Sequence, residues 1–245
     1  MIKNFFARIW ALWAMVTFLS SMLIIYLPFL FCSLLKEPKR SSASYQLFKG
    51  WMRIFLPMVG VRIHLKGLEY FEKGRNYVIV CNHSSFMDIP VSTTKVPGPN
   101  KTIAKIEMSR IPVFGYLYSL GAVLVDRRSK KSRLQSYLEM KKVVEMGMHM
   151  LIYPEGTRNK SNAGLLPFHD GAFNLAVDTQ TPLIPAILKG ANRVLPSNKL
   201  FYFLPGCISF EFLPPLSPGS DAGALKSKTY TLMMGNLMEK ETAGT

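Results

Sequence analysis

Two residues that could form a catalytic pair, His83 and Asp88, stand five positions apart directly after a run of apolar residues at 77–81. A hydroxyl group is a poor nucleophile at neutral pH, so its attack on a thioester needs a base within hydrogen-bond reach. An imidazole can be that base, and a carboxylate beside it fixes the tautomer and stabilises the imidazolium. The pair therefore predicts activation of a hydroxyl group. The alternative is a histidine with a purely structural role.

Ser84 and Ser85 follow the histidine and are the alternative nucleophiles. A serine nucleophile of the α/β-hydrolase type sits in a G-x-S-x-G turn, and neither serine does. Serine is also among the preferred residues at helix N-termini. We therefore expect both serines to cap the helix that follows.

A second apolar run, at 148–153, leads into Pro-Glu-Gly-Thr-Arg at 154–158. The glycine lets the backbone approach a ligand closely, and the arginine can hold phosphate oxygens with two parallel hydrogen bonds. Lys105 and Arg127, each beside an apolar segment, are placed to face an anionic ligand. These residues predict a phosphate site. A solvated surface turn is the alternative for residues 154–158 taken alone.

The elements that must position these residues alternate between strands and helices. Six apolar runs have strand length, namely 61–65, 77–81, 122–125, 148–153, 183–188 and 208–213. The clearest helix of the part after residue 60 covers 132–146, where apolar residues recur near one face. This alternation predicts an α/β fold with a mixed, largely parallel sheet flanked by helices. Both clusters should then lie at the carboxyl ends of strands, where such sheets bind ligands.

The N-terminal part is different, because no charged residue occurs from Ile9 to Leu35. This stretch is long enough to cross a bilayer and longer than the apolar part of a cleaved signal peptide. Residues 45–58 form a second helix that suits an interface or packs on the rest of the protein. We expect residues 1–59 to anchor a catalytic domain of residues 60–245 to the membrane. Spanning the bilayer and dipping into one leaflet both remain open.

Composition limits the possible partners. The chain of 245 residues has a formal net charge of +15, which attracts nucleic acid, anionic lipid or phosphorylated substrates. No nucleic-acid-binding motif is recognisable, so we expect an anionic membrane surface and no nucleic acid. The three cysteines and four histidines are scattered, which predicts neither a disulfide framework nor a metal site.

Several blocks of the sequence, in order, resemble the motifs of the 1-acylglycerol-3-phosphate acyltransferase family, within the wider glycerolipid acyltransferases. The resemblance covers roughly residues 60–215. The matching blocks are residues 82–88 (N-H-x-S-x-x-D), Lys105 to Leu117 (K-x-E followed by P-x-x-G-x-L), residues 121–127 (Gly to Asp-Arg), residues 154–158 with 164–173 (P-E-G-T-R followed by G-L-L-P-F and G-A-F), and the Ile-Pro pair at 184–185. Two positions depart from the family, which often has lysine where His169 stands and valine where Ala186 stands.

The resemblance implies that His83 takes the proton of an acceptor hydroxyl, Asp88 orients it, and the hydroxyl attacks an acyl thioester without a covalent acyl-enzyme. The acceptor would be 1-acylglycerol 3-phosphate, the product phosphatidic acid, and the co-substrate acyl-coenzyme A or acyl carrier protein, with no further cofactor. The reaction would take place at the cytoplasmic face of the membrane. The residues that would bind the acceptor phosphate are Glu155, Gly156, Thr157 and Arg158, assisted by Lys105 and Arg127.

Three other functions fit parts of this pattern. The same chemistry could serve another acceptor, such as glycerol 3-phosphate, another lysophospholipid or a lyso-aminolipid. A thioester hydrolase would need no acceptor at all. A protein of the same fold could also bind lipid without catalysis, although the intact histidine and aspartate argue against this.

Overall fold

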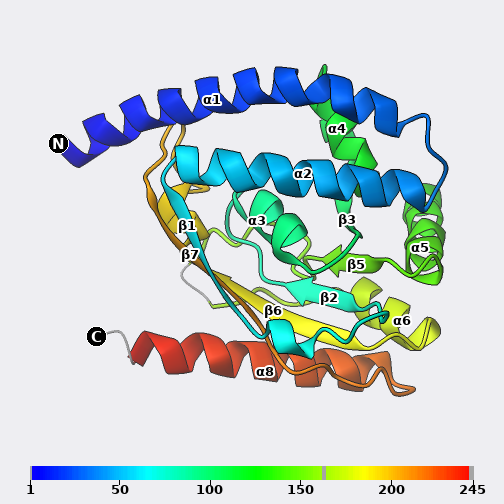
Figure 1. Cartoon of the computed structure of the whole chain (residues 1–245). Helices are drawn as coiled ribbons and strands as arrows, with labels where there is room; N and C mark the ends of the chain where they lie inside the picture. The colour runs from blue at the N-terminus through cyan, green and yellow to red at the C-terminus, as the bar shows by residue number, and fades with distance from the viewer. Residues whose placement is uncertain (1, 162–163, 243–245) are drawn as a thin grey trace.

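A seven-stranded sheet with helices on both faces forms the centre of the molecule (Figure 1). The computed structural model describes residues 2–161 and 164–242. The strands are β1 (Val61–Lys66), β2 (Val78–Cys81), β3 (Asn100–Lys105), β4 (Ala122–Val125), β5 (His149–Ile152), β6 (Leu183–Lys189) and β7 (Gly206–Phe212). The helices are α1 (Ile2–Cys32), α2 (Lys39–Met58), α3 (Asp88–Lys95), α4 (Phe114–Leu120), α5 (Lys130–Glu145), α6 (Gly171–Asp178), α7 (Ala191–Val194) and α8 (Ala222–Thr242), with short 3-10 turns η1 (Leu68–Tyr70) and η2 (Ile106–Arg110).

The strand order is β1-β7-β6-β2-β5-β3-β4, and every neighbouring pair is parallel except β6 with β7. This confirms the predicted α/β class with a mixed, largely parallel sheet. β2 lies between β6 and β5, so the chain segments that follow β2 and β5 emerge side by side at one edge of the sheet. Both predicted clusters follow these two strands.

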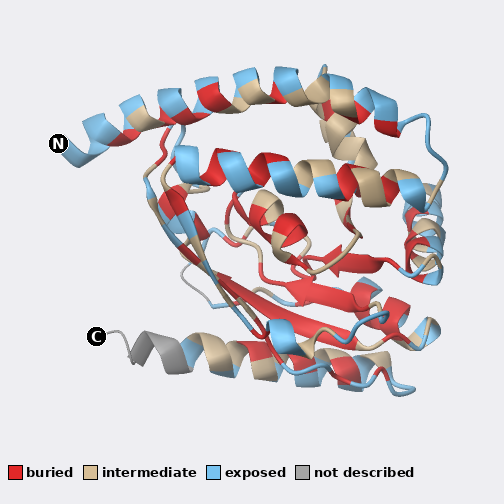
Figure 2. Ribbon diagram, in the orientation of Figure 1, coloured by how far each residue is buried: buried red, intermediate tan, exposed pale blue. Residues whose placement is uncertain are grey.

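Side chains alternate along the buried strands and divide the core in two (Figure 2). On β2, Ile79 and Cys81 join the core under α1, α2 and α3, while Val78 and Val80 join the core against α5, α6 and α8. This is the two-residue period of a strand buried on both faces. The pocket that His83 lines lies on the face of the sheet covered by α1 and α2.

Tryptophan side chains fasten α1 to α2. Trp10 and Trp13 donate indole hydrogen bonds to the carbonyls of Val59 and Met58, at 2.9 and 3.1 Å. Trp51 donates to the Ser21 hydroxyl at 2.9 Å. The core under these helices is continuous with the sheet, so the helix pair packs on the domain that follows it.

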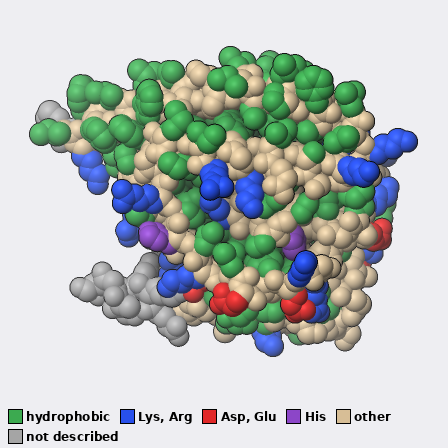
Figure 3. Space-filling view, viewed as in Figure 1, with side chains coloured by type: hydrophobic (Ala, Val, Ile, Leu, Met, Phe, Trp, Pro, Cys, Tyr) green, Lys and Arg blue, Asp and Glu red, His purple; other side chains and the backbone are tan. Residues whose placement is uncertain are grey.

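The outer face of α1 is apolar and exposed. α1 has 31 residues and contains an 18-residue window with a mean hydropathy of 2.1, so by length and composition it is able to cross a membrane. Figure 3 shows hydrophobic side chains gathered over this helix, with lysine and arginine side chains below it. The division of the chain at residue 59 stays a prediction, although α2 ends at Met58 and β1 begins at Val61.

The sequence pattern missed one strand and several helices. β3 reads Asn-Lys-Thr-Ile-Ala-Lys, so it lacks the apolar run that marks the other strands. Its alternate residues Asn100, Thr102 and Ala104 are buried nonetheless. The predicted helix at 132–146 begins two residues earlier, at Lys130, and the one at 45–58 begins at Lys39. The helices α4, α6, α7 and α8 were not predicted from the sequence.

Gly67 shows how closely the end of β1 approaches β7. It has a φ of +79°, and a Cβ atom there would lie 2.1 Å from the carbonyl oxygen of Phe212. Gly74 has a similar φ of +81°, but a Cβ atom added there would have open space around it. We predict that Gly74→Ala lowers the free energy of unfolding by about 1–2 kcal/mol, the cost of the left-handed conformation. Gly67→Ala should lower the free energy of unfolding by a further ~1–3 kcal/mol, because the backbone of Gly67 or Phe212 must move to make room for the Cβ atom.

Urea denaturation of the two variants beside the wild type measures this difference. Equal losses in both variants would show that the contact with Phe212 relaxes freely.

Candidate active site

His83 and Asp88 are in direct contact at the carboxyl end of β2. His83 Nδ1 lies 2.8 Å from Asp88 Oδ2, and the two side chains are 14% and 1% exposed. Because an ionised carboxylate only accepts hydrogen bonds, Nδ1 carries the proton that it shares with Asp88. This leaves Nε2 as the acceptor, on a ring that lines an apolar pocket. The geometry is that of a base oriented by a carboxylate.

The turn between β2 and α3 holds the carboxylate in place. The backbone N–H groups of Ser84 and Ser85 donate to the same Asp88 Oδ2, at 2.6 and 2.8 Å. Asp88 is the first residue of α3, where a negative charge is also favoured by the helix dipole. The orientation of the imidazole therefore depends on the backbone of this turn.

The expectation that both serines cap α3 is wrong. The residue before α3 is Met87, and Asp88 itself accepts the backbone hydrogen bonds of the turn. The Ser85 hydroxyl accepts from the Met87 N–H at 3.1 Å and donates to the Leu195 carbonyl at 2.6 Å. Ser85 is fully buried, and these two hydrogen bonds connect the turn to the segment at Leu195.

The segment after β5 holds the backbone of His83 from both sides. The His83 N–H donates to Glu155 Oε1 at 2.8 Å, and its carbonyl accepts from the Asn159 N–H at 2.7 Å. The Tyr153 ring stacks on the imidazole, with centroids 4.3 Å apart, and its hydroxyl lies 2.7 Å from the Ser92 hydroxyl. Tyr153 and Asn159 were not singled out from the sequence. Their positions directly beside the 154–158 block were the available signal.

The Glu155 side chain is buried and already accepts backbone hydrogen bonds, which does not suit the predicted role in binding the acceptor phosphate. Its side chain is 3% exposed, and its second oxygen accepts from the Leu166 N–H at 2.9 Å. Burial raises the pKa of the Glu155 carboxyl, and the hydrogen bonds from the backbone of Leu166 and His83 oppose part of that rise. A carboxylate that is already committed to two backbone N–H groups positions His83 instead of binding an anion.

The cationic residues lie around the mouth of the site. The Arg158 guanidinium stacks over the Phe86 ring, 3.6 Å from its centroid. An Arg127 nitrogen donates to the Gly156 carbonyl. Arg158, Arg127, Lys105, Gly156 and Thr157 all line the same pocket as His83. The structure thus brings these five residues together around one pocket with His83, while Glu155 contacts the His83 backbone from a buried position.

Gly156 has a left-handed backbone conformation and lies against the ring of His169. Gly156 has a φ of +66°, and a Cβ atom there would lie 2.7 Å from His169 Cδ2. His169 is exposed and its N–H donates to the Pro154 carbonyl, at 2.8 Å. The other departure from the family pattern, Ala186, is buried in β6 opposite Cys81. His169 therefore adjoins the site, while Ala186 belongs to the core.

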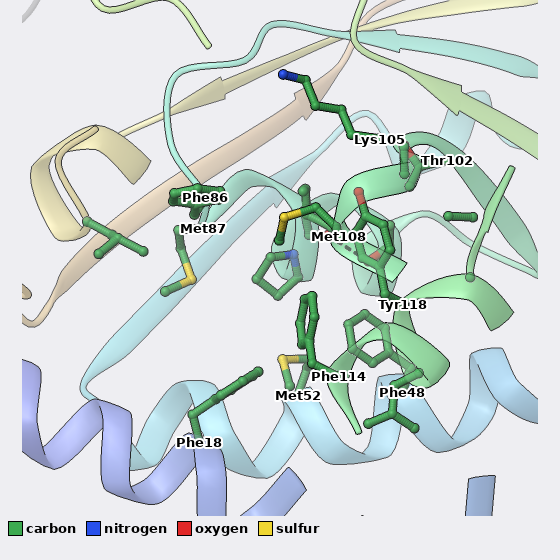
Figure 4. A pocket seen from close by; sticks show the side chains of 18 of the residues that line it. Phe18, Phe48, Met52, Phe86, Met87, Thr102, Lys105, Met108, Phe114 and Tyr118 are labelled. Carbon is green, nitrogen blue, oxygen red and sulfur yellow. Dashed lines mark hydrogen bonds between the residues drawn. The ribbon is translucent and has the colours of Figure 1, made fainter. Parts of the chain in front are cut away.

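The pocket is a long apolar cavity of about 720 Å³ between the helix pair and the sheet. Figure 4 shows Phe18, Phe48 and Met52, from α1 and α2, on one side and Phe86, Thr102 and Lys105 on the other. Aromatic and methionine side chains of this kind adapt to flexible alkyl chains. The arrangement can hold an apolar tail inside the cavity while its polar end meets the cationic residues and His83.

The arrangement offers little to a metal ion. Among residues 2–161 and 164–242, no group of three or more His, Cys, Asp or Glu side chains is placed to hold one.

Comparison with known proteins gives matches along most of the chain. The Acyltransferase family model matches residues 62–189. A 1-acyl-sn-glycerol-3-phosphate acyltransferase of Cocos nucifera is 31% identical over 166 residues, covering 67% of this chain and 53% of the relative. The human 1-acyl-sn-glycerol-3-phosphate acyltransferase beta is 30% identical over 182 residues, covering 74% and 65%. The chain thus spans between half and two thirds of the length of these relatives.

Similarity also extends to a bacterial relative and a crystal structure. The 1-acyl-sn-glycerol-3-phosphate acyltransferase of Escherichia coli is 28% identical over 189 residues, which cover 76% of this chain and 75% of the relative. The crystal structure of the 1-acyl-sn-glycerophosphate (LPA) acyltransferase PlsC from Thermotoga maritima superimposes with a TM-score of 0.79. The match covers 98% of this chain and 97% of that one at 23% identity, so it establishes a shared fold that includes the N-terminal helices.

We predict that Glu155→Ala lowers the free energy of unfolding by about 1–3 kcal/mol, because it leaves two backbone N–H groups without their acceptor. Glu155→Gln should cost less, since it keeps the shape and one accepting oxygen and carries no buried charge. Glu145→Ala, at an exposed position of α5, is the control. Denaturant unfolding measures all three. A Glu155→Ala variant as stable as the control would contradict the positioning role.

Proposed function

The chain belongs to the acyltransferase family, as its motifs predicted, and we propose that it acylates the free hydroxyl of 1-acylglycerol 3-phosphate to form phosphatidic acid. The donor is an acyl thioester, either acyl-coenzyme A or acyl carrier protein. The observation that supports this function best is the His83/Asp88 pair at the mouth of an apolar cavity with cationic side chains beside it. A lysophospholipid has both parts that this arrangement suits, an alkyl tail and a phosphate.

The proposed reaction follows from the protonation states of the pair. Nε2 of His83 takes the proton of the acceptor hydroxyl as its oxygen attacks the thioester carbonyl carbon. Asp88 stabilises the imidazolium that forms, and the buried carboxylate of Glu155 adds to the negative potential around it. The tetrahedral intermediate then expels the thiolate, which receives the proton from Nε2. The acyl group passes directly between substrates, so no acyl-enzyme forms.

The acceptor phosphate would meet Arg158, Arg127 and Lys105. Stacking on Phe86 holds the Arg158 guanidinium in one plane, which reduces the freedom that it must lose on binding an anion. The hydrogen bond from Arg127 to Gly156 restrains the second guanidinium in the same way. Thr157 is exposed and follows Gly156 in the same turn, where its hydroxyl is available as a further donor.

The location of the enzyme is proposed from the same structure. The apolar outer face of α1 would enter the lipid, and the catalytic domain would lie at the cytoplasmic face of the membrane, where acyl thioesters are made. An anionic membrane surface suits the net charge of +15. A lipid acceptor would then reach the pocket beside α1 and α2 without crossing water.

We predict that His83→Ala and Asp88→Asn lower kcat by about 10²–10⁴-fold with purified full-length protein, lysophosphatidic acid and acyl-coenzyme A, because the base or its orientation is lost. His64→Ala, at an exposed position of β1, should keep the wild-type rate. Quantifying phosphatidic acid by mass spectrometry gives the readout. Equal rates in wild type and a folded His83→Ala variant would make His83 structural and disprove the mechanism.

The same assay separates the alternative acceptors. Parallel reactions contain glycerol 3-phosphate, a lyso-aminolipid, monoacylglycerol or no acceptor. Turnover of another acceptor without lysophosphatidic acid would change the substrate and preserve the mechanism. Thioester loss without an acceptor would indicate hydrolysis.

We also predict that Leu23→Glu weakens binding to vesicles about tenfold or more, because burying one leucine side chain contributes ~1.5–3 kcal/mol. Leu134→Glu, on α5, is a matched control, since Leu23 and Leu134 are both 62% exposed. Co-sedimentation with vesicles measures the partition. Equal loss in both variants would show that α1 is not the membrane contact. Vesicles without anionic lipid should bind wild type more weakly.

A further inference from the structure

The Tyr153 ring lies on the face of the His83 imidazole. The ring centroids are 4.3 Å apart, and the two planes are inclined by 22°. Tyr153 is 8% exposed, and both side chains line the apolar pocket. His83 therefore has two partners, a carboxylate at the edge of its ring and an aromatic ring on its face.

Each partner restricts a different motion of the imidazole. The hydrogen bond to Asp88 fixes the position of Nδ1. Nε2 lies on the far side of the ring, so it still moves when the ring tilts about that hydrogen bond. The Tyr153 ring opposes the tilt, because tilting either presses the two faces together or loses their contact. The position of Nε2 therefore depends on Tyr153 as well as on Asp88.

Tyr153 is itself held at its backbone and at its hydroxyl. Its backbone precedes Pro154, and the residue before a proline is largely restricted to extended conformations. Its hydroxyl lies 2.7 Å from the Ser92 hydroxyl, and Ser92 is fully buried. In α3, Ser92 stands about one turn after Asp88, so both side chains lie on the same face of that helix. The same helix thus carries the carboxylate that fixes Nδ1 and the hydroxyl that fixes the stacked ring.

The Tyr153 hydroxyl is not suited to proton transfer. Burial raises the pKa of this hydroxyl well above its usual value, so the group keeps its proton. Its hydrogen-bond partner is Ser92. What Tyr153 offers to His83 is therefore the face of its ring.

The chain contains a second stack of a tyrosine on a histidine, which serves as a reference. Tyr77 and His149 have ring centroids 5.8 Å apart and an angle of 12° between the planes. Nδ1 of His149 accepts from the Tyr77 N–H at 3.1 Å, and Nε2 lies 2.8 Å from the Pro97 carbonyl. Both nitrogens of this buried imidazole are thus bonded to the backbone, and burial lowers the pKa of His149. This stack belongs to the core, whereas the stack on His83 lies at the pocket.

We propose that Tyr153 is a positioning residue for acyl transfer, which holds the plane of the His83 imidazole so that Nε2 meets the acceptor hydroxyl. This inference rests on the proposed function, because it takes His83 to be the base. A misplacement of about 1 Å can lower a reaction rate about 100-fold, so loss of the stack should be visible in kcat.

The kinetics of three variants of the full-length protein test the role of the ring. Tyr153→Leu should lower kcat about 10–100-fold, while the KM values for lysophosphatidic acid and acyl-coenzyme A change less than about threefold. Tyr153→Phe keeps the ring and loses only the contact with Ser92, so it should retain most of the wild-type kcat. Tyr77→Leu removes the ring of the other stack and is the matched control, which should keep the wild-type kcat per folded molecule.

A spectroscopic measurement follows the imidazole without turnover. Proton NMR with ¹⁵N-labelled histidine detects the Nδ1 proton that His83 shares with Asp88, and His83→Ala identifies its signal. The signal should persist in Tyr153→Phe and Tyr77→Leu and weaken in Tyr153→Leu, because a tilting ring bends the N–H···O angle. Tyr153→Met, which also lacks the ring, takes the place of Tyr153→Leu if the latter does not fold.

The outcomes separate the inference from the function. A folded Tyr153→Leu variant with the wild-type kcat, or with the same loss as Tyr77→Leu, would overturn the positioning role. A loss of kcat with an unchanged His83 signal would also overturn it, because the effect would not pass through the imidazole. If the wild type forms no phosphatidic acid while the signal weakens only in Tyr153→Leu, the proposed function fails and the positioning of His83 by Tyr153 stands.

Discussion

The contact between His83 and Asp88 depends on one turn, and most of the molecule serves to hold that turn. Asp88 Oδ2 accepts from the imidazole and from two backbone N–H groups, so the carboxylate cannot rotate without breaking all three hydrogen bonds. The turn starts from β2, the strand in the middle of the buried sheet, and continues into α3. A base that is oriented before the substrate arrives needs no rearrangement during the reaction.

The second constraint is that a phosphate and an alkyl chain need opposite environments a short distance apart. The parallel sheet provides this, because its strand ends carry loops with cations while its face, under α1 and α2, is apolar. The helix pair closes the cavity and also exposes the apolar face of α1. The same two helices can therefore bind the membrane and form the wall of the lipid site.

Much of this was predictable from local sequence. The strands β2 and β5 are apolar runs followed by reactive residues, so the fold class and the proximity of the two clusters follow from the pattern. β3 was missed because its residues are mostly polar, yet it forms part of the pocket wall. Glu155 was assigned to the phosphate site because a motif does not show which N–H groups donate hydrogen bonds to its carboxylate. Its distance to the backbone of His83, seventy-two residues earlier, exists only in three dimensions.

These two misses have a common physical origin. Periodicity reports which residues are buried on average, but it cannot tell a polar side chain that completes the backbone from one that faces a cavity. Glu155 belongs to the first kind, since both of its oxygens accept backbone hydrogen bonds. Thr102 belongs to the second kind, since it lies on the wall of the cavity. Buried polar residues that the fold satisfies contribute to its stability, while polar residues on the pocket wall contribute to what the pocket can bind.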